Sequence, residues 1–220
     1  MARPVKKPPE QWREAILAAA KELFLEKGFE AVSVAEIMAR ARGAKGMFYR
    51  CFGSKEELMQ ALGDRAFLEN NPFDAVRERR DLSGLEKMRL VLELFQQEGS
   101  RNSLNLQSAP ILKDPRILAA AVANNRRVLT PLWLELLREG VADGSVQTQY
   151  PQELAQLLPL IDFWLLPSVF PASPEEIRHR YRFVVQALAA MGLPLLPEAF
   201  PPLGEEILSA LPAAEGGEER

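Results

Sequence analysis

The feature that most constrains this chain is a pair of helix-start patterns that lie close together near its N-terminus. Ser33 is followed three positions later by Glu36, and Ser54 is followed three positions later by Glu57. In this pattern the serine hydroxyl caps the first backbone N–H groups of a helix, and the acidic side chain returns to the serine N–H. With a break at residues 42–43, the stretch between the two starts has room only for short helices and a tight turn. It is therefore predicted to form a helix-turn-helix.

Helical periodicity surrounds this stretch and predicts an all-α fold. Residues 10–28 carry apolar side chains at spacings of three and four, from Ile16 to Phe24, and Gly28 follows as a C-cap. A short helix is predicted from Lys45 to Cys51. Similar patterns predict helices at 54–69, 83–98, 115–140, 151–167 and 173–191, an irregular segment at 101–114, and a tail that mixes a short proline-bounded helix with an acidic end.

The composition is typical of a globular protein and argues against several classes of chemistry. The chain of 220 residues is 47% hydrophobic and 26% charged, and no apolar run approaches the roughly 20 residues that cross a bilayer. One cysteine, Cys51, and one histidine, His179, are too few for a disulfide framework, a multi-cysteine zinc site or a histidine-based catalytic cluster. We therefore expect a cytoplasmic protein that is not an enzyme, with no cofactor, no metal and no membrane partner.

The charge is distributed unevenly along the chain. The net charge is −3, but residues 1–60 hold 11 Lys and Arg against 8 Asp and Glu, whereas residues 61–220 hold 16 against 22. The N-terminal part is therefore basic and the remainder acidic. This asymmetry favours a polyanion as the partner of the N-terminal part alone.

The residues from Ile16 to Leu58 resemble the DNA-binding domain of the TetR family of bacterial transcriptional regulators. The features that carry the resemblance are Ile16-Leu17, Ala19-Ala20, Leu23-Phe24, Gly28-Phe29, Ser33-Val34, Ile37, Ala41, Gly46, Phe48-Tyr49, Phe52 and Ser54-Lys55-Glu56. The resemblance implies a three-helix DNA-binding domain followed by a larger helical domain for ligand binding and dimerisation. It also implies a homodimeric repressor that binds a palindromic operator in double-stranded DNA and releases it when a small-molecule effector binds.

We accordingly predict four segments. These are a basic N-terminal arm at 1–8, the DNA-binding domain at 9–56, the effector-binding and dimerisation domain at 57–200, and a C-terminal tail at 201–220. Two other functions remain open from the sequence. One is a helical ligand carrier, and the other is a DNA-binding division or nucleoid factor that uses the same fold without a small effector.

The turn of the predicted motif departs from the family pattern in two places. Relatives usually have glycine and then valine after the alanine that ends the second helix, where this chain has Arg42 and Gly43. Relatives often begin the reading helix with serine or threonine, where this chain has Ala44. The turn glycine is thus displaced by one position, and a capping oxygen worth about 1 kcal/mol is missing.

The predicted DNA-contacting residues are Ser33, Lys45, Gly46, Met47, Tyr49, Arg50 and Lys55. The resemblance places Tyr49 and Lys55 against phosphates. Lys45 adds positive charge at the start of the reading helix. Gly46 either lets the backbone approach the duplex closely or merely relaxes the turn.

Three features near the reading helix allow two interpretations each. Met47 and Arg50 are expected to read base edges, with a phosphate contact as the alternative for Arg50. The basic arm at 1–8 either follows an adjacent groove or is a solvated tail. Cys51 is either a small apolar filler, which is the favoured interpretation, or a redox switch.

A ligand pocket is predicted between the helices at 115–140 and 151–167. Asn125 falls on an apolar stripe, so its amide either hydrogen bonds within the core or faces a polar ligand atom. Pro131 and Pro159 are expected to kink their helices and open space between them. The predicted pocket residues are Asn125, Trp133, Asp162 and Phe163.

The last two long helices resemble the pair with which TetR family members dimerise. The predicted interface residues are Leu158, Ile161, Leu165, Tyr181, Val184 and Leu188. The same stripes would equally serve an intramolecular core. Dimerisation is expected mainly because two-fold proteins read palindromic sites.

Overall fold

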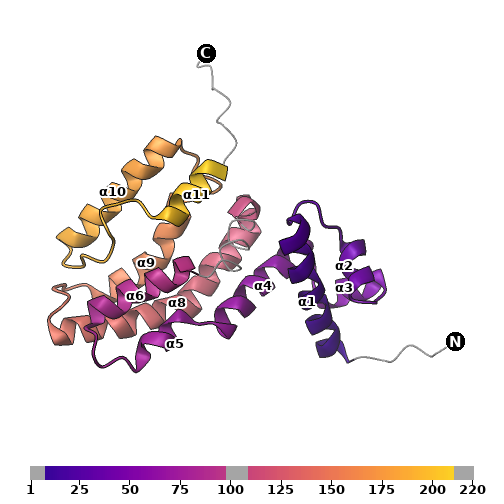
Figure 1. Ribbon diagram of the computed structural model, residues 1–220, viewed down its shortest axis with the longest axis horizontal. Helices are drawn as coiled ribbons and strands as arrows, with labels where there is room; N and C mark the ends of the chain where they lie inside the picture. Colours follow the sequence, from indigo (N-terminus) through magenta and orange to yellow (C-terminus); the bar gives the residue numbers. More distant parts are fainter. Residues whose placement is uncertain (1–7, 98–108, 211–220) are drawn as a thin grey trace, which may run out of the picture. The chain divides into compact units, whose positions relative to one another are not determined.

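The computed structural model describes residues 8–97 and 109–210, and all the regular secondary structure in these ranges is helical (Figure 1). The all-α fold class is therefore confirmed. The described residues divide into two compact units, one formed by residues 8–70 and 109–111 and the other by residues 71–97 and 112–210. Within the described ranges, no helix is long and apolar enough to span a membrane.

The first unit is built around a long helix that contacts three shorter ones. These helices are α1 (Pro9–Lys27), α2 (Val34–Arg40), α3 (Lys45–Cys51) and α4 (Lys55–Glu69). The predicted apolar stripe of α1 is buried and packs against α2, α3 and α4. The fully buried side chains of this unit include Ile16, Phe24, Ile37, Phe48, Phe52 and Leu58.

The two serine caps form as predicted, with one difference. The Ser33 hydroxyl accepts the Glu36 N–H at 3.2 Å, and the Glu36 carboxylate accepts the Ser33 N–H at 2.9 Å, so the capping box is complete. The Ser54 hydroxyl likewise accepts the Glu57 N–H at 3.1 Å. The Glu57 carboxylate, however, accepts the Gly53 N–H at 2.6 Å, so this second box closes one residue earlier than the pattern predicts.

The turn between α2 and α3 is a Schellman motif with an arginine at its left-handed position. The Gly43 N–H donates to the Met38 carbonyl at 2.9 Å and the Arg42 N–H to the Ala39 carbonyl at 3.1 Å. Arg42 has a φ of 58°, the conformation that glycine adopts at least cost. Gly43 is required for another reason: a Cβ there would lie 2.6 Å from the Trp12 ring and 2.5 Å from Met38 Cε.

The second unit contains the remaining helices. They are α5 (Pro72–Arg77), α6 (Gly84–Gln97), the 3₁₀ helix η1 (Ala109–Lys113) at the boundary of the two units, α8 (Pro115–Asp143), α9 (Pro151–Leu165), α10 (Pro174–Ala190) and α11 (Pro202–Ala210). The four long helices match their predicted ranges closely, and α11 is the short proline-bounded helix predicted in the tail.

Two short elements of this part of the chain were not predicted. The first is α5, whose start is capped by the Asn71 side chain accepting the Phe73 N–H at 3.1 Å. The second is η1, which occupies the end of the segment predicted to be irregular; residues 101–108 of that segment lie outside the described ranges. Both are short, and apolar periodicity needs several turns to become visible.

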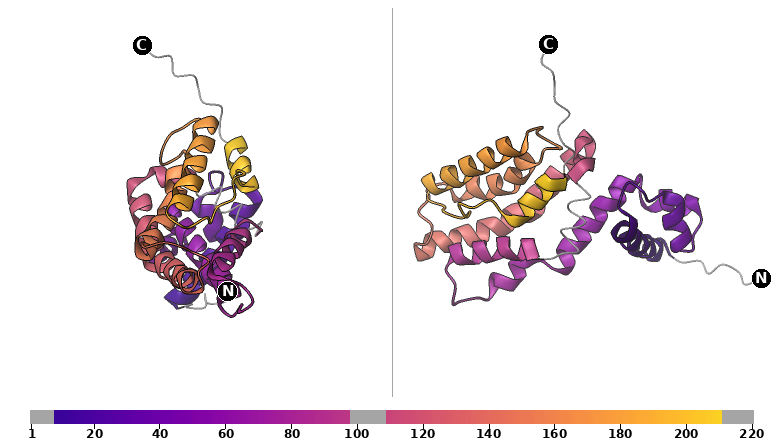
Figure 2. Two further views of the ribbon diagram at one scale, coloured as in Figure 1. Left: turned by 90° about the vertical axis from the view of Figure 1, so that its left-hand side faces the viewer. Right: turned by 45° about the horizontal axis from the view of Figure 1, so that its top comes forward.

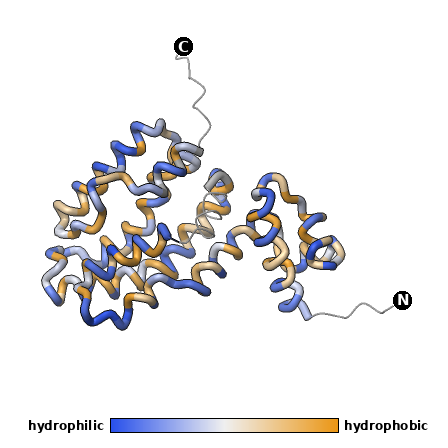
Figure 3. Tube along the Cα trace, viewed as in Figure 1, coloured by the Kyte–Doolittle hydropathy of each residue, from blue (hydrophilic) through white to orange (hydrophobic). Residues whose placement is uncertain are grey.

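The second unit packs by close helix contacts. α8 lies against α6 and α9, and α10 lies against α9. At the crossing of α6 and α8, a Cβ at Gly84 would lie 2.2 Å from the Gly140 nitrogen, so a glycine is needed there. Both views of Figure 2 show α10 and α11 side by side, and the Arg178 guanidinium joins them by donating two hydrogen bonds to the Glu205 carboxylate. Figure 3 shows hydrophobic and hydrophilic residues alternating along most of these helices, as expected for amphipathic elements.

Candidate nucleic-acid interface on α3

The short helix α3 has one face in the core and one face open to solvent. Phe48 is fully buried, and Met47 and Cys51 pack partly buried against the same core. Lys45, Gly46, Tyr49 and Arg50 are exposed, and Tyr49 retains 55% of its surface. The exposed face therefore combines two cations, a phenol and a glycine.

The two cations of this face are not neutralised by the protein. Within the described ranges, the side chains of Lys45 and Arg50 form no hydrogen bond or ion pair. By contrast, the nearby Arg40 of α2 binds Glu26 at 3.1 Å and Glu22 at 2.9 Å, both on α1. Charges left without a partner beside paired ones are suited to an external anion such as phosphate.

Gly46 has no structural role that we can identify inside the first unit. Its φ is not positive, and a Cβ built on it would meet no atom within 4 Å. A glycine inside a helix costs about 1 kcal/mol relative to alanine. The backbone conformation and the surrounding space would thus accept a side chain at this position, and the close approach of the Gly46 backbone to a duplex stays a prediction.

Ser33 is exposed, but its hydroxyl is engaged in the cap. It accepts the Glu36 N–H and also donates to the Glu36 carboxylate at 2.9 Å. These bonds to the Ser33 backbone and hydroxyl, together with Lys27 at 3.0 Å, lower the pKa of Glu36 to about 2. A DNA contact by the Ser33 hydroxyl stays a prediction and would have to coexist with this network.

The resemblance places Lys55 against a phosphate, and in the structure its side chain is engaged within the first unit. Its ammonium group donates to the carbonyl oxygens of Phe29 at 2.7 Å and Val32 at 3.0 Å, and it lies 4.2 Å from the centre of the Phe29 ring. The side chain is partly buried. Two of its three N–H groups are thus used inside the first unit, which sequence reasoning could not foresee because both acceptors are backbone atoms distant in sequence.

Arg42 is a candidate that the sequence analysis described only as a departure from the family. It is exposed, and within the described ranges its guanidinium group has no hydrogen-bond or ion-pair partner. It lies in the turn before α3, three positions ahead of Lys45. The signal available in the sequence was a basic residue at the position where relatives have glycine. The arm at 1–8 lies almost wholly outside the described residues.

Cys51 lies between the core and the start of α1. Its side chain is half-buried, and its sulfur is 3.9 Å from the Pro9 carbonyl oxygen. The Cys51 carbonyl in turn accepts a hydrogen bond from Arg13 at 3.4 Å. These contacts are those of a small packing residue.

The residues predicted to line a ligand pocket are engaged within the second unit. Trp133 is buried and packs edge-on against Phe73, with ring centres 4.9 Å apart. The Asn125 amide donates to the Pro159 carbonyl at 3.2 Å, which is the intramolecular alternative for this residue. Asp162 is exposed on α9. A pocket formed by these residues and Phe163 stays a prediction.

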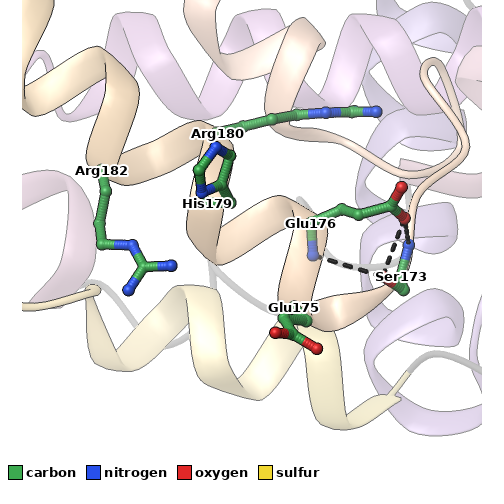
Figure 4. Close-up of a pocket in the computed structure, with 6 residues that line it drawn as sticks. All are labelled: Ser173, Glu175, Glu176, His179, Arg180 and Arg182. Carbon is green, nitrogen blue, oxygen red and sulfur yellow. Dashed lines mark hydrogen bonds between the residues drawn. The ribbon is translucent and has the colours of Figure 1, made fainter.

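A surface hollow of about 420 Å³ lies along α10 and is lined by Ser173, Glu175, Glu176, His179, Arg180 and Arg182 (Figure 4). Three of its polar residues already serve the fold. Ser173 and Glu176 form a complete capping box, and Arg180 donates to the carbonyl oxygens of Trp164 at 3.3 Å and Phe170 at 3.1 Å. None of the predicted ligand residues lies in this hollow.

The residues predicted for a dimer interface lie in two environments. Tyr181, Val184, Leu188 and Leu158 are buried inside the second unit, whereas Ile161 and Leu165 are half-buried, and the interface itself stays a prediction. The apolar stripe of α10 was correctly placed on one face, but that face packs inward. The large apolar residues of α9, α10 and their connection that remain exposed are Leu157, Leu160, Phe170 and Phe183.

Sequence comparison gives a family for the region that contains this interface. The model of the family described as bacterial regulatory proteins, tetR family, matches residues 16–62. The HTH-type transcriptional repressor Rv3405c of Mycobacterium tuberculosis is 33% identical over 91 residues, which are 38% of this chain and 48% of that protein. The chain therefore spans about half the length of this relative. The HTH-type transcriptional repressor KstR2 of Mycolicibacterium smegmatis is 26% identical over 188 residues, 80% of this chain and 90% of that protein.

Solved structures extend the likeness to both units. The structure of Thermus thermophilus FadR, described as a TetR family transcriptional repressor in complex with lauroyl-CoA, has a TM-score of 0.59 at 24% identity and covers 86% of this chain and 98% of that chain. RolR in complex with resorcinol has a TM-score of 0.59 at 20% identity and covers 93% of this chain and 97% of that chain. The fold is thus that of a two-unit helical protein with an N-terminal helix-turn-helix. Residues 16–62 thus match the TetR family of bacterial regulatory proteins, and both units share their fold with solved TetR regulators.

Proposed function

We propose that this chain is a homodimeric transcriptional repressor that binds a palindromic DNA operator through α3 and leaves it when a small molecule binds the second unit. The proposal joins the charge of the α3 face to the match of residues 16–62 with the TetR family. Phosphate contacts would fix the protein on the duplex, and base-edge contacts from Met47 and Arg50 would select the sequence.

The observation that carries the DNA-binding part of the proposal is Gly46. It occupies the exposed face of α3 between two cations, Lys45 and Arg50, and no contact inside the first unit requires a glycine. A duplex pressed against this face would require one, because a side chain would hold the backbone away from the phosphates or bases. Gly46 thus makes α3 less stable at the position where the duplex would approach.

The proposed effector response follows from linkage. A ligand lowers operator affinity only if it binds the released state more tightly than the DNA-bound state. Two proteins with the same fold were solved with bound small molecules, lauroyl-CoA in one and resorcinol in the other. These ligands differ widely in chemistry, so they support a small-molecule effector as a class and name none for this chain.

The proposed homodimer would use the outward face of α9 and α10. Leu160 and Phe183 are 42% and 58% exposed, and Trp164 packs edge-on against Phe183 with ring centres 5.9 Å apart. Exposed aromatic and aliphatic side chains that adjoin across two helices are suited to an isologous contact with a second copy.

The experiment that tests the DNA-binding part compares Gly46→Ala with Gly63→Ala. Gly63 is a matched control because it is also exposed in a helix, has no positive φ, and leaves nothing within 4 Å of an added Cβ. Each substitution is expected to stabilise the protein by about 0.5–1 kcal/mol in urea unfolding. Only Gly46→Ala is expected to weaken binding to DNA from upstream of the protein's own gene.

The binding should be measured across a salt series with a scrambled duplex of the same length as reference. Binding that prefers the upstream DNA and weakens linearly in log affinity against log salt concentration supports the proposal. Equal affinities for the Gly46→Ala and Gly63→Ala variants would remove α3 as the DNA-contacting element. A chain that binds neither duplex at any salt concentration would favour the ligand carrier.

A further inference from the structure

The connection between α1 and α2 is held by a residue of α4. Phe29 and Val32 lie in this connection, at residues 28–33, and their carbonyl oxygens accept hydrogen bonds from the Lys55 ammonium at 2.7 and 3.0 Å. Lys55 is the first residue of α4. The start of α4 is therefore tied directly to the residue that precedes Ser33, the N-cap of α2.

The two accepting residues are themselves fixed in the core. Phe29 is 4% exposed and packs on Phe24 at a ring separation of 5.2 Å, and Val32 is 1% exposed. The Val32 N–H donates to the Phe29 carbonyl at 3.4 Å, which makes the connection a tight turn. The Lys55 side chain thus satisfies backbone carbonyls that the turn leaves facing the start of α4.

The charge of Lys55 also interacts with an aromatic ring inside the first unit. The ammonium lies 4.2 Å from the centre of the Phe29 ring, within the range of a cation–π contact. Hydrogen bonds from a charged donor are about twice as strong as neutral ones. A phosphate would have to recruit this group while it is held by two carbonyl oxygens and an aromatic ring, whereas Lys45 and Arg50 have no such competition.

We propose that Lys55 is a positioning residue: it fixes the start of α2 to the start of α4 and supports DNA binding through that link, without contacting a phosphate. The inference rests on the proposed DNA-binding function. It gives a physical route by which a displacement of the first turn of α4 would be transmitted to Ser33 and α2. When the Lys55 ammonium moves, the Phe29 and Val32 carbonyl oxygens either move with it or their hydrogen bonds to it break.

The test compares Lys55→Met, which keeps the aliphatic stem and removes the donors, with Lys55→Arg, which keeps a charged group with several donors. Lys45→Met serves as the reference for loss of an exposed charge. Each full-length protein is measured for DNA affinity across a salt series and for amide hydrogen exchange at Val32 and Ser33, with the amides of α1 as an internal control for folding.

For Lys55→Met we expect affinity to fall by about tenfold at every salt concentration. We also expect the slope of log affinity against log salt concentration to be unchanged, and amide hydrogen exchange at Val32 and Ser33 to be faster. Lys55→Arg should restore most of the affinity. Lys45→Met should instead reduce the magnitude of the slope by about 0.9, the value for one lost phosphate contact.

The opposite pattern would overturn the inference. Lys55 would be a phosphate contact if Lys55→Met reduced the slope of log affinity against log salt concentration as Lys45→Met does, and left amide hydrogen exchange at Val32 and Ser33 unchanged. If the wild-type chain bound no DNA, the proposed function would fail separately. The exchange comparison would then decide whether the link exists: faster exchange in Lys55→Met supports it and unchanged exchange removes it.

Discussion

At the scale of single residues, Arg42 adopts a backbone conformation that its side chain disfavours. It sits at the left-handed position of the Schellman turn with a φ of 58°, where a residue with a Cβ is strained by about 1–2 kcal/mol. Glycine would relieve this strain but would lose more backbone entropy on folding. The chain therefore keeps an exposed cation next to α3 at a cost in stability.

Arg42→Gly should consequently stabilise the protein, by about 0.5 kcal/mol after the glycine entropy is subtracted. The measurement is urea unfolding followed by circular dichroism. Arg50→Gly is the control, because Arg50 is also exposed and without an intramolecular partner but lies within the α3 helix, where glycine should destabilise. Equal losses of stability in both variants would contradict the strain assigned to Arg42.

Glu36 gives the first unit a specific dependence on pH. Its pKa is lowered from 4.5 to about 2 by hydrogen bonds from the Ser33 backbone and from the side chains of Lys27 and Ser33. A carboxylate with a lowered pKa contributes stability that is fully present above the ordinary value and is lost as the pH falls toward the folded value. The contribution of Glu36 should therefore disappear between pH 4.5 and about 2.

The measurement is unfolding as a function of pH for the wild type and for Glu36→Gln. The variant should be less stable at neutral pH, and the difference should shrink as the pH falls through this window. Glu30→Gln is the matched control, since Glu30 is exposed in the same connection and has no hydrogen-bond or ion-pair partner in the described part of the chain. A constant difference between Glu36→Gln and wild type at all pH values would show that the capping box is not the source.

At the scale of elements, α10 carries two apolar surfaces with different roles. One is buried against α9 and the segment between α10 and α11, and it includes Tyr181, whose hydroxyl donates to the Pro197 carbonyl at 2.8 Å and whose ring packs on Phe200. The other faces solvent and includes Phe183. Only the second is available to a partner.

Introducing charge on this outward face should dissociate the proposed dimer. Leu160→Glu combined with Phe183→Glu would place two carboxylates of each copy in an apolar contact, where desolvation is costly without a partner. Light scattering over a range of concentrations should show a monomer. Val141→Glu, at a residue of α8 that is 41% exposed, is the control and should leave the dimer intact. A double variant that remains dimeric would place the interface elsewhere.

The same elements show how far local rules extend. The Ser33 cap was predictable because its partners lie within three residues, and the range of α3 followed from its flanking turn. The partners of Lys55 and the positive φ of Arg42 were not, because they depend on packing between distant segments. The α10 stripe illustrates the middle case: periodicity located an apolar face at Tyr181, Val184 and Leu188, but nothing in a single helix says whether that face meets its own chain or a second copy.

At the scale of the whole molecule, the proposed dimer should decide the strength of DNA binding as well as its symmetry. One α3 face offers a small number of cations, and a second copy doubles the phosphates that can be neutralised. Because log affinity depends on salt in proportion to that number, halving it should roughly halve the slope. A monomeric chain should therefore bind operator DNA more weakly and with less sensitivity to salt.

The Leu160→Glu and Phe183→Glu double variant tests this coupling when it is titrated with operator DNA and with a duplex carrying one half-site. The variant should bind both duplexes with similar affinity and with about half the wild-type salt slope, whereas the wild type should prefer the complete operator. Gly46→Ala should give the complementary result, a weakened affinity in a protein that is still dimeric. If the monomeric variant kept the full slope, the phosphate contacts would have to come from a single copy. The second unit would then have no part in DNA recognition beyond carrying the effector site.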